Sequence, residues 1–519
     1  MGVIGDWVRR NAWRYPDKDA TVFEGTRFTW EAFNNRVNSL SNSMVNALGL
    51  KKGDKVAILQ QNSHRYLELY FALSKAGLVA VPINYGLAAR EILFILNDSK
   101  AEALIVDDEY LPVINEITHE LKLLQRYICI GSDPSCALNY EEMISNGNNA
   151  EPDVTVSEND VIMQMYTSGT TGFPKGVMTT HKNMEVNNVN ILMSDRKASS
   201  KDIPLVTPPL CSMGAVFLSM CYMYLGCTHV ILKKFEPLEV LKAVETFKIT
   251  NLQLTPTMLN TVLKHPDFSS YDTDSLRLVF YGGSSMPVPL LRDAINKLKC
   301  EFVQGYGSTE NLVVCLLSPE DHVLEGPENV QKRLASGGRE ALNSDVRIFN
   351  DHDGEVPRGE VGEIVVRGDS VMKGYWNRDE ANKEVFRNDW LHTGDLGYMD
   401  RDGYVYVVDR KKDMFVSGGV NIYPREIEDI FYAHDAVLEC AVIGVPDEKL
   451  GEIPVAVIVL KSGMSVSEEE LVEHCKKSDL AECKKPGKIV FVDQPLPKNA
   501  SGKIVKRLLR NQTLLGVKA

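Results

Sequence analysis

One pattern recurs through much of the chain and limits its fold: an apolar stretch, an amphipathic stretch, then another apolar stretch. It begins at Lys55, where KVAILQQN and LVAVPIN flank the segment SHRYLELYFALSKAG. The same alternation returns around ALIVDDEYLPVINEITHELK and YICIG, around HVILKKFEPLEVLKAVETF and NLQLTP, and around LRLVFYGG and EFVQGYG. Strand–helix–strand units place their strands parallel and their helices on the sheet faces. The sequence therefore predicts an α/β fold with large, mostly parallel sheets covered by helices.

Chain length and two changes of pattern predict more than one domain. The chain has 519 residues, which exceeds what one hydrophobic core usually organises. Near Asp345 the pattern changes to short β-rich segments, and after Asp409 a basic, glycine-containing stretch leads into mixed α and β pattern. We expect a large N-terminal domain over residues 1–411, with a β subdomain at about 340–411, and a small mobile α+β C-terminal domain over residues 412–519.

Composition excludes several classes of protein. Hydrophobic residues make up 44% and charged residues 24%, as in an ordinary globular protein. The formal net charge of -13 argues against sequence-independent nucleic-acid binding, which requires a basic face. The ten cysteines form no C-x-x-C pair and show no ligand spacing with histidine, so we expect neither a zinc site nor a disulfide framework.

The sequence also bears on localisation. The N-terminus, MGVIGDWVRR, lacks the apolar region of a signal peptide, and Asp6 stands where a myristoylation signal needs Ser or Thr. The span from Ala215 to Leu232 carries no Asp, Glu, Lys or Arg, but Gly226 interrupts it and β-branched residues follow. We interpret it as a buried helix leading into a strand, and we expect a cytoplasmic protein without a transmembrane segment.

The most specific motif is YTSGTTGFPKG, from Tyr166 to Gly176, which follows the apolar run VIMQM. Glycines, hydroxyl side chains and one lysine offer a polyphosphate backbone N–H groups, O–H groups and a positive charge. The motif is not a Walker A loop, because Pro174 replaces the second glycine and Gly176 follows Lys175 where Ser or Thr is required. The sequence therefore predicts a phosphate-binding loop and disfavours a P-loop phosphoryl-transfer enzyme.

This loop resembles the phosphate loop of the adenylate-forming (ANL) superfamily, which comprises acyl-CoA synthetases, luciferases and the adenylation domains of peptide synthetases. Five further motifs follow in the family's order: YGGSSMP, QGYGSTE, LHTGDLGYMDRDGYVYVVDRKKD, SGGVNIYPREIE and PKNASGK. The resemblance spans nearly the whole chain. It implies an enzyme that activates a carboxylic acid with ATP and Mg²⁺, and it favours the acyl-CoA synthetase branch.

The resemblance assigns residues to the first half-reaction, in which a carboxylate attacks the α-phosphate and pyrophosphate leaves. It implies that Thr309 contacts the α-phosphate, that Glu310 holds Mg²⁺, that Tyr306 stacks on adenine, and that Lys503 stabilises the developing charge. The resemblance also implies that Asp395 and Arg410 contact the ribose of ATP. The predicted ATP-binding set is completed by Thr167, Ser168, Gly169, Thr170, Thr171, Lys175, Gly283, Gly305 and Gly307.

In the second half-reaction the thiol of coenzyme A attacks the acyl-adenylate. The resemblance implies that the C-terminal domain rotates about Lys412, which withdraws Lys503 and brings the loop of Gly418 and Gly419 to the pantetheine arm. A residue at a domain crossing suits a hinge, and glycines permit close backbone approach to a thin ligand.

The acyl pocket is where the resemblance is weakest. Related enzymes line it from segments that correspond here to residues 183–193, 209–214 and 281–283, and we take Cys211, Ser212, Tyr281 and Gly282 as candidates. Many relatives carry an aromatic residue and a histidine where this chain has Cys211 and Ser212. No His/Asn motif accompanies Cys211, so we interpret it as a core residue rather than a nucleophile. Little charge among the candidates indicates an uncharged fatty, alicyclic or aromatic acid.

We therefore expect an AMP-forming acyl-CoA synthetase that uses ATP, Mg²⁺ and coenzyme A. The expected partners are small molecules and no nucleic acid, and a homodimer is compatible with the sequence. The main alternative is an enzyme that loads the activated acid onto a separate carrier protein. A luciferase-like oxygenase has no motif of its own here, and a nucleotide sensor would be expected to lack Lys503 or Glu310.

Overall fold

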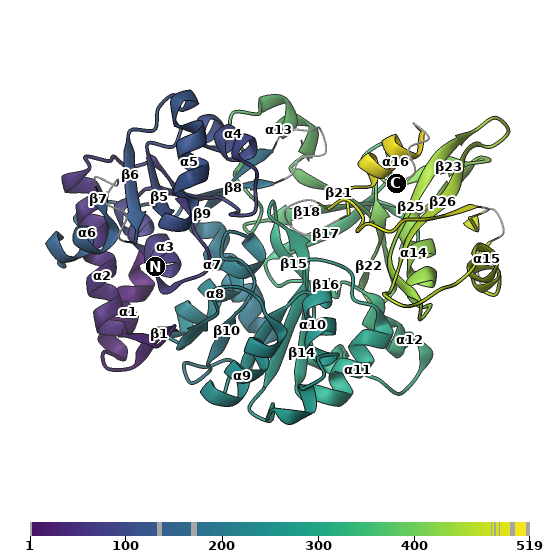
Figure 1. Cartoon of the computed structure of the whole chain (residues 1–519), viewed down its shortest axis with the longest axis horizontal. Coiled ribbons are helices and arrows are strands. Elements are labelled where there is room, and N and C mark those ends of the chain that lie inside the picture. The colour runs from purple at the N-terminus through teal and green to yellow at the C-terminus, as the bar shows by residue number, and fades with distance from the viewer. Residues whose placement is uncertain are drawn as a thin grey trace. The chain divides into compact units, whose positions relative to one another are not determined.

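The structure is a computed structural model that describes residues 3–131, 138–167, 174–478, 480–481, 484–486, 488–498 and 504–514, the side chains of residues 511–514 excepted. The chain forms two compact units (Figure 1). The first consists of Met1–Val346 and Val366–Leu391, and the second of Arg347–Val365 and His392–Ala519. The domain boundary predicted at residues 411–412 stays a prediction.

Among the described residues, the first unit contains a nine-stranded sheet in the order β16-β15-β14-β13-β12-β10-β11-β1-β2. Neighbouring strands are parallel from β14 to β1, whereas β2, β15 and β16 run antiparallel to their neighbours. The strands are β1 (Asp19–Phe23), β2 (Thr26–Thr29), β10 (Pro204–Val206), β11 (His229–Ile231), β12 (Asn251–Leu254), β13 (Leu278–Gly282), β14 (Glu301–Ser308), β15 (Leu312–Leu317) and β16 (Arg339–Glu340).

A second sheet of the first unit has eight strands within the described ranges, in the order β19-β9-β8-β4-β3-β5-β6-β7. Its strands from β8 to β7 are parallel, and β9 is antiparallel to both β8 and β19. The strands are β3 (Lys55–Leu59), β4 (Val79–Pro82), β5 (Ala103–Asp107), β6 (Arg126–Ile130), β7 (Leu138–Asn139), β8 (Val161–Thr167), β9 (Lys175–Thr180) and β19 (Gly374–Tyr375). The predicted α/β fold with mostly parallel sheets is confirmed.

Helices cover both faces of both sheets. They are α1 (Gly5–Arg14), α2 (Trp30–Asn42), α3 (His64–Ala76), α4 (Ala89–Ser99), α5 (Leu111–Ile117), α6 (Tyr140–Asn146), α7 (His181–Ser194), α8 (Met213–Leu225), α9 (Pro237–Phe247), α10 (Pro256–Leu263), α11 (Val288–Leu298), α12 (Glu328–Gln331) and α13 (Asp379–Val385). In β13, Val279 and Tyr281 pack with α9, α10 and α11, while Leu278 and Phe280 pack with α7 and α8 (Figure 1). This period-2 alternation is expected of a strand buried on both faces.

The interpretation of the uncharged span from Ala215 is confirmed. Helix α8 ends at Leu225, Gly226 caps it with a φ of 82°, and β11 follows. Met213, Met220 and Met223 are buried in the core. Within the described residues, no helix combines the length and apolar character needed to cross a membrane.

The sequence led us to expect no disulfide framework, and the structure differs at one described position. Cys129, in β6, is disulfide-bonded. The other described cysteines are free thiols, and all of them except Cys300 are buried.

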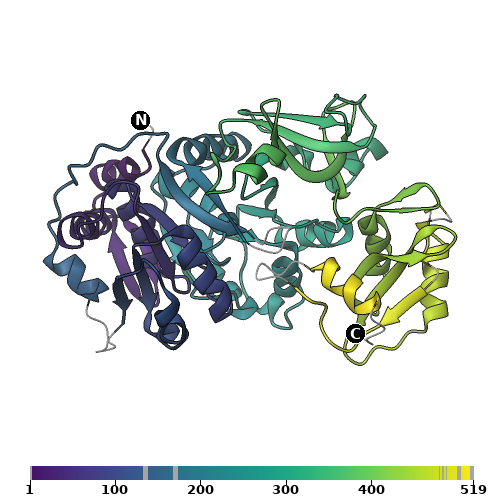
Figure 2. The same ribbon diagram turned by 90° about the horizontal axis from the view of Figure 1, so that it is seen from above.

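The second unit has its own sheet and core. Counting only described residues, the sheet has five strands in the order β24-β23-β26-β25, with β27 parallel to β26. These are β23 (Phe415–Ser417), β24 (Val420–Ile422), β25 (Val437–Asp447), β26 (Gly451–Leu460) and β27 (Lys488–Phe491). Helices α14 (Pro424–Tyr432) and α15 (Glu468–Lys476) pack on one face, and α16 (Lys506–Leu514) packs on the other through Leu509 (Figure 2).

A further sheet contains the points where the chain passes between the units. Its strands run in the order β17-β18-β21-β20, with β22 beside β21. They are β17 (Ser344–Phe349), β18 (Gly362–Gly368), β20 (Phe386–Arg387), β21 (Trp390–Met399) and β22 (Val405–Arg410). These are the short β segments that the sequence indicates after Asp345.

Candidate active site

The phosphate-loop motif connects two antiparallel strands. Thr167 is the last residue of β8, Lys175 is the first of β9, and the two residues pair across the strands. Ser168, Gly169, Thr170 and Thr171 lie outside the described residues. A Walker A loop leads from a strand into a helix, whereas this loop leads from a strand into a strand. The topology therefore agrees with the sequence argument against a P-loop.

The base of the loop is held by buried polar contacts. The Tyr166 hydroxyl donates to Asp98 Oδ2 at 2.8 Å and accepts from Gln164 Nε2 at 2.9 Å. Burial raises the pKa of Tyr166, so the phenol stays neutral. A side chain at Gly176 would lie 2.7 Å from Gln164 Nε2, so this motif glycine is required for packing in addition to any role toward phosphate.

A segment that the sequence analysis missed, residues 374–378 (GYWNR), packs beside this base. The Trp376 amide donates to the Gly176 carbonyl at 2.8 Å, and its indole donates to the Asp98 carbonyl at 3.1 Å. Arg378 forms an ion pair of 2.6 Å with Asp98 Oδ1. Tyr375 lies on β19, which pairs with β9. The aromatic pair within GYWNR was a signal in the sequence, but nothing local indicates its partner strand.

Glu310 is positioned by a tight turn between β14 and β15. Asn311 Oδ1 accepts from the Ser308 amide at 2.6 Å, and Ser308 Oγ accepts from the Glu310 amide at 3.2 Å. The Glu310 carbonyl accepts from the Met372 amide at 2.7 Å. Thr309 lies in the same turn and is half-buried. Gly305, Tyr306 and Gly307 occupy the last part of β14.

One tyrosine joins the two motifs. The Tyr375 hydroxyl donates to Glu310 Oε1 at 3.1 Å, and Lys175 Nζ lies 4.9 Å from the centre of the Tyr375 ring. The structure thus brings Lys175 and Glu310, which are far apart in the sequence, to the same side chain. Because all three residues belong to the first unit, this arrangement is internal to it.

The end of β13 places the YGG motif beside QGYG. Gly282 pairs with Gly305 of the parallel strand β14, and a side chain at Gly282 would meet the Gly305 carbonyl at 2.6 Å. Gly283 follows the strand with a φ of 81°. The Tyr281 side chain is fully buried, and its hydroxyl lies 3.0 Å from His322 Nε2. Tyr281 therefore takes part in the core, and only its backbone is left to line a pocket.

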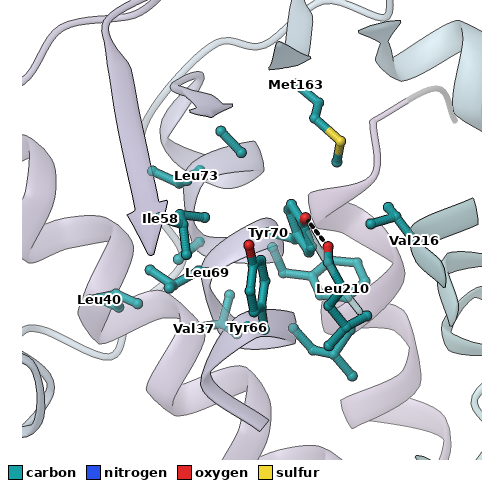
Figure 3. Close-up of a cluster of buried hydrophobic side chains, with 14 of the residues drawn as sticks. Val37, Leu40, Ile58, Tyr66, Leu69, Tyr70, Leu73, Met163, Leu210 and Val216 are labelled. Carbon is teal, nitrogen blue, oxygen red and sulfur yellow. Dashed lines mark hydrogen bonds between the residues drawn. The ribbon is translucent and has the colours of Figure 1, made fainter. Parts of the chain in front are cut away.

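The loop of Cys211 and Ser212 is firmly anchored. Asn62 accepts from the Leu210 amide at 2.7 Å and donates to the Pro208 carbonyl at 3.0 Å. The Tyr70 hydroxyl donates to the Leu210 carbonyl at 2.6 Å, as Figure 3 shows. Cys211 is buried, and burial raises the pKa of its thiol to about 12. A thiol with such a pKa remains protonated at neutral pH, which agrees with its interpretation as a core residue.

In the second unit, the two residues predicted at the ribose lie together. Asp395 on β21 and Arg410 on β22 are cross-strand partners, and Arg410 Nε lies 2.6 Å from Asp395 Oδ1. The Asp395 side chain is 9% exposed and that of Arg410 is 42% exposed. A carboxylate beside a half-exposed guanidinium can accept hydrogen bonds from hydroxyl groups, so the geometry is compatible with the predicted role.

The hinge and CoA-loop candidates follow along the chain. Lys412 lies in the turn between β22 and β23 and is exposed. Gly418 and Gly419 form the two-residue connection of the β23–β24 hairpin, with φ values of 56° and 82°. Two consecutive positive φ values are those of a type I′ turn, which strongly favours glycine. Lys503 lies outside the described residues.

Comparison with known proteins agrees with this arrangement. The family model described as "AMP-binding enzyme" matches residues 8–376, and that described as "AMP-binding enzyme C-terminal domain" matches residues 426–503. Feruloyl-CoA synthase from an Amycolatopsis species is 38% identical over 510 residues, covering 98% of this chain and 99% of the relative. Long-chain-fatty-acid–CoA ligase FadD13 from Mycobacterium tuberculosis is 35% identical over 517 residues, covering 99% of both chains.

Solved structures show the same likeness. o-Succinylbenzoate CoA synthetase from Bacillus subtilis, in complex with the acyl-adenylate intermediate OSB-AMP, has a TM-score of 0.85 at 32% identity, covering 98% of this chain and 97% of the other. The anthranilate CoA ligase AuaEII, in complex with anthranoyl-AMP, has a TM-score of 0.89 at 28% identity, covering 100% and 98%.

The chain belongs to the AMP-binding enzymes of the adenylate-forming superfamily. Its activity is that of an AMP-forming acid–thiol ligase. The predictions that the chain is a CoA ligase and that it binds ATP are confirmed. The carboxylic acid that it activates is not specified by the comparisons.

Proposed function

We propose that this enzyme is an acyl-CoA synthetase for uncharged fatty, alicyclic or aromatic carboxylic acids. The observation that carries the proposal is the convergence of Lys175 and Glu310 on Tyr375, because it gathers the phosphate-loop lysine and the motif carboxylate in one place. An enzyme that loads a carrier protein would use the same adenylation residues and is the second candidate.

In the first half-reaction, a carboxylate oxygen of the acid attacks the α-phosphorus of ATP. The bond between this phosphorus and the bridging oxygen to the β-phosphate breaks, and pyrophosphate leaves. Lys175 and the loop from Thr167 hold the polyphosphate, Thr309 contacts the α-phosphate, and Lys503 stabilises the charge that develops during attack. Tyr306 and the glycines at 283, 305 and 307 form the adenine wall, and Asp395 with Arg410 holds the ribose.

Magnesium fits the residues present. Among the described residues, no three His, Cys, Asp or Glu side chains gather as a metal-binding group. Mg²⁺ is usually held by one or two carboxylates together with substrate phosphates, so the single carboxylate of Glu310 suffices. Bound there with ATP, the ion would neutralise charge on the phosphates.

In the second half-reaction, the thiolate of coenzyme A attacks the acyl carbon, the thioester bond forms, and AMP leaves with the electron pair of the broken acyl–phosphate bond. We assign Gly418 and Gly419 to the pantetheine arm and Lys412 to the hinge of the C-terminal domain. Val416 and Leu450, both largely exposed, flank the glycine turn and offer this arm apolar contact.

The substrate class rests on the acyl-pocket candidates. Cys211, Ser212 and Gly282 carry no charge, and the Tyr281 ring is occupied in the core. A charged substituent on the acid would therefore lose its hydration without gaining a partner from these residues. Of the acids named for the relatives, feruloyl and long-chain fatty fall in this class, whereas 2-succinylbenzoate carries a second carboxylate and does not.

A panel of acids tests the proposed function. Short, long, branched, alicyclic and aromatic acids, with an amino acid included, are scored by ATP-dependent AMP release with and without coenzyme A. We expect one of the uncharged classes of acid to support AMP release, and we expect this release to rise when coenzyme A is added. Release that requires a carrier protein instead would favour the second candidate, and preference for the amino acid would contradict the substrate class.

Separate assays of the half-reactions test two residue roles. Lys503→Ala should abolish acid-dependent pyrophosphate exchange, and it should leave thioester formation from supplied acyl-adenylate largely intact. Gly419→Val should do the reverse, because a side chain at a φ of 82° strains the turn and obstructs the thiol arm.

Matched controls are available in the same unit. Lys498→Ala removes a lysine that forms an ion pair with Glu439, and Gly463→Val places valine at another open glycine with positive φ. Both controls should retain both half-reactions. Equal loss of the two half-reactions in Lys503→Ala would rule out its role, and undiminished thioester formation in Gly419→Val would remove Gly419 from the CoA channel.

Three further expectations stay predictions: a Mg²⁺ requirement, residence in the cytoplasm and a homodimer. Metal dependence of pyrophosphate exchange tests the first of these.

A further inference from the structure

Tyr375 occupies an unusual position between two charged groups of the adenylation site. Its hydroxyl donates to the Glu310 carboxylate at 3.1 Å, and its ring faces the Lys175 ammonium at 4.9 Å. A hydrogen bond to a carboxylate and a cation over an aromatic ring each stabilise one arrangement of the charged partner. Tyr375 is 7% exposed, whereas Glu310 and Lys175 are half-buried.

The backbone of Tyr375 is fixed independently of its hydroxyl. Asn382 accepts from the Tyr375 amide at 2.7 Å and donates to its carbonyl at 3.0 Å. Tyr375 also pairs with Val177 of β9, and the next residue, Trp376, bonds to Gly176 and Asp98. The ring is therefore held in place by neighbours that do not depend on Glu310. A fixed side chain can orient a carboxylate, whereas a free one would follow it.

We propose that Tyr375 is a positioning residue that sets the Glu310 carboxylate for the metal-bound phosphates and seats the Lys175 ammonium beside them. The inference rests on the proposed function and deepens it. Glu310 has two carboxylate oxygens, and the Tyr375 hydroxyl occupies one of them, so the other remains for the ion. Without this hydrogen bond, the Glu310 side chain gains rotamers that do not face the ion. The entropy lost when the side chain is ordered on binding then weakens the binding of ATP with Mg²⁺.

The hydroxyl is tested by Tyr375→Phe, which keeps the ring and therefore the contact with Lys175. ATP affinity is measured by titration calorimetry over a series of Mg²⁺ concentrations and in EDTA, and pyrophosphate exchange is measured in parallel. We expect the dissociation constant for ATP to rise about tenfold with Mg²⁺, which corresponds to one hydrogen bond to a charged group, and to change less than twofold in EDTA.

The ring is tested by Tyr375→Leu, which removes the contact with Lys175 as well. We expect this variant to bind ATP more weakly both with Mg²⁺ and in EDTA. The matched control is Tyr224→Leu, because Tyr224 also has a cation over its ring, that of Arg10 at 4.5 Å, in a part of the first unit that belongs to neither motif. The control should bind ATP as the wild type does.

A double variant separates positioning from a general structural effect. In a Glu310→Gln background, Tyr375→Phe should add less than twofold to the ATP dissociation constant, because the group it positions is already altered. A full tenfold increase of the dissociation constant in the double variant would overturn the proposal. The proposal would also be overturned if the single variant Tyr375→Phe bound ATP like the wild type at every Mg²⁺ concentration, or if its ATP affinity fell equally with Mg²⁺ and in EDTA. Failure of the wild type to exchange pyrophosphate with any acid would overturn the proposed function, and this result is separate from the calorimetric comparison.

Discussion

At the scale of single residues, the glycines of the QGYG motif are required first by packing. A side chain at Gly307 would lie 1.6 Å from the carbonyl of Leu312, the first residue of β15, which directly follows the turn that carries Thr309 and Glu310. Gly305 is similarly enclosed, with the Phe280 ring 2.7 Å from the place of a side chain. The motif therefore keeps β14 and β15 close enough to hold the turn.

Gly307→Ala should distort this turn. Because the clash is with backbone rather than with a movable side chain, we expect a loss of about 3 kcal/mol in the free energy of unfolding and a marked loss of pyrophosphate exchange. Urea unfolding followed by tryptophan fluorescence measures the first of these effects.

Gly214→Ala is the control for this prediction. Gly214 lies in the first turn of α8 with no atom near the place of a side chain, so alanine should leave stability unchanged or raise it by up to about 1 kcal/mol. If Gly307→Ala proved as stable as Gly214→Ala, the packing role would be wrong.

At the scale of elements, the loop that enters α8, which carries the acyl-pocket candidates Cys211 and Ser212, is anchored by several hydrogen bonds. Asn62 bonds to both Pro208 and Leu210, Tyr70 bonds to Leu210, and Ser212 Oγ donates to the Pro209 carbonyl at 2.7 Å. The small side chains of Cys211 and Ser212 therefore follow a segment whose backbone is held by hydrogen bonds from Asn62 and Tyr70.

Asn62→Ala should release this loop. It leaves a buried amide and a buried carbonyl without their partner, which costs about 2–4 kcal/mol in the free energy of unfolding, and it should raise KM for the acid more than KM for ATP. Asn42→Ala is the matched control, because Asn42 also bonds to two backbone groups, here both carbonyls, but at the surface, and it should cost less than about 1 kcal/mol. Equal costs would contradict the anchoring role.

At the scale of the whole molecule, four histidines with lowered pKa values make stability sensitive to acid. Burial lowers the pKa of each of them to about 4, and all four belong to the first unit: His64, His181, His229 and His322. In the unfolded chain these side chains regain an ordinary pKa of about 6.5. Their neutral forms are therefore favoured by folding, and this contribution is fully present above pH 6.5.

Stability of the first unit should fall as the pH falls from 6.5 toward 4, since the unfolded state then binds protons that the folded state does not. Each histidine contributes about 1.4 kcal/mol per pH unit, so the slope near pH 5 approaches about 5 kcal/mol per pH unit for the four. All five tryptophans lie in the first unit, so urea unfolding followed by tryptophan fluorescence measures this unit alone.

A single replacement tests the assignment. His229→Gln should reduce the slope near pH 5 by about one quarter, and His119→Gln, which changes an exposed histidine of the same unit, should leave it unchanged. A slope that is the same in both variants would show that His229 does not take part.

The sequence by itself determined the fold class, most strands and helices, and the two ends of the phosphate loop. Alternating apolar and amphipathic stretches are local signals, and strand–helix–strand units have few ways to pack, so β3, α3 and β4 appear where KVAIL, HRYLELYFALSKA and VAVP predict them. The glycine turn at Gly418 and Gly419 is likewise a local requirement.

Tertiary structure alone decided which distant residues meet. Nothing near Tyr375 in the chain indicates Glu310 or Lys175, because the pairing of β19 with β9 brings them together. Tyr281, a pocket candidate by sequence, is buried because a strand side chain faces whichever helices cover that side of the sheet. Motifs report which groups the chemistry needs, whereas contacts between separate strands determine how those groups are oriented.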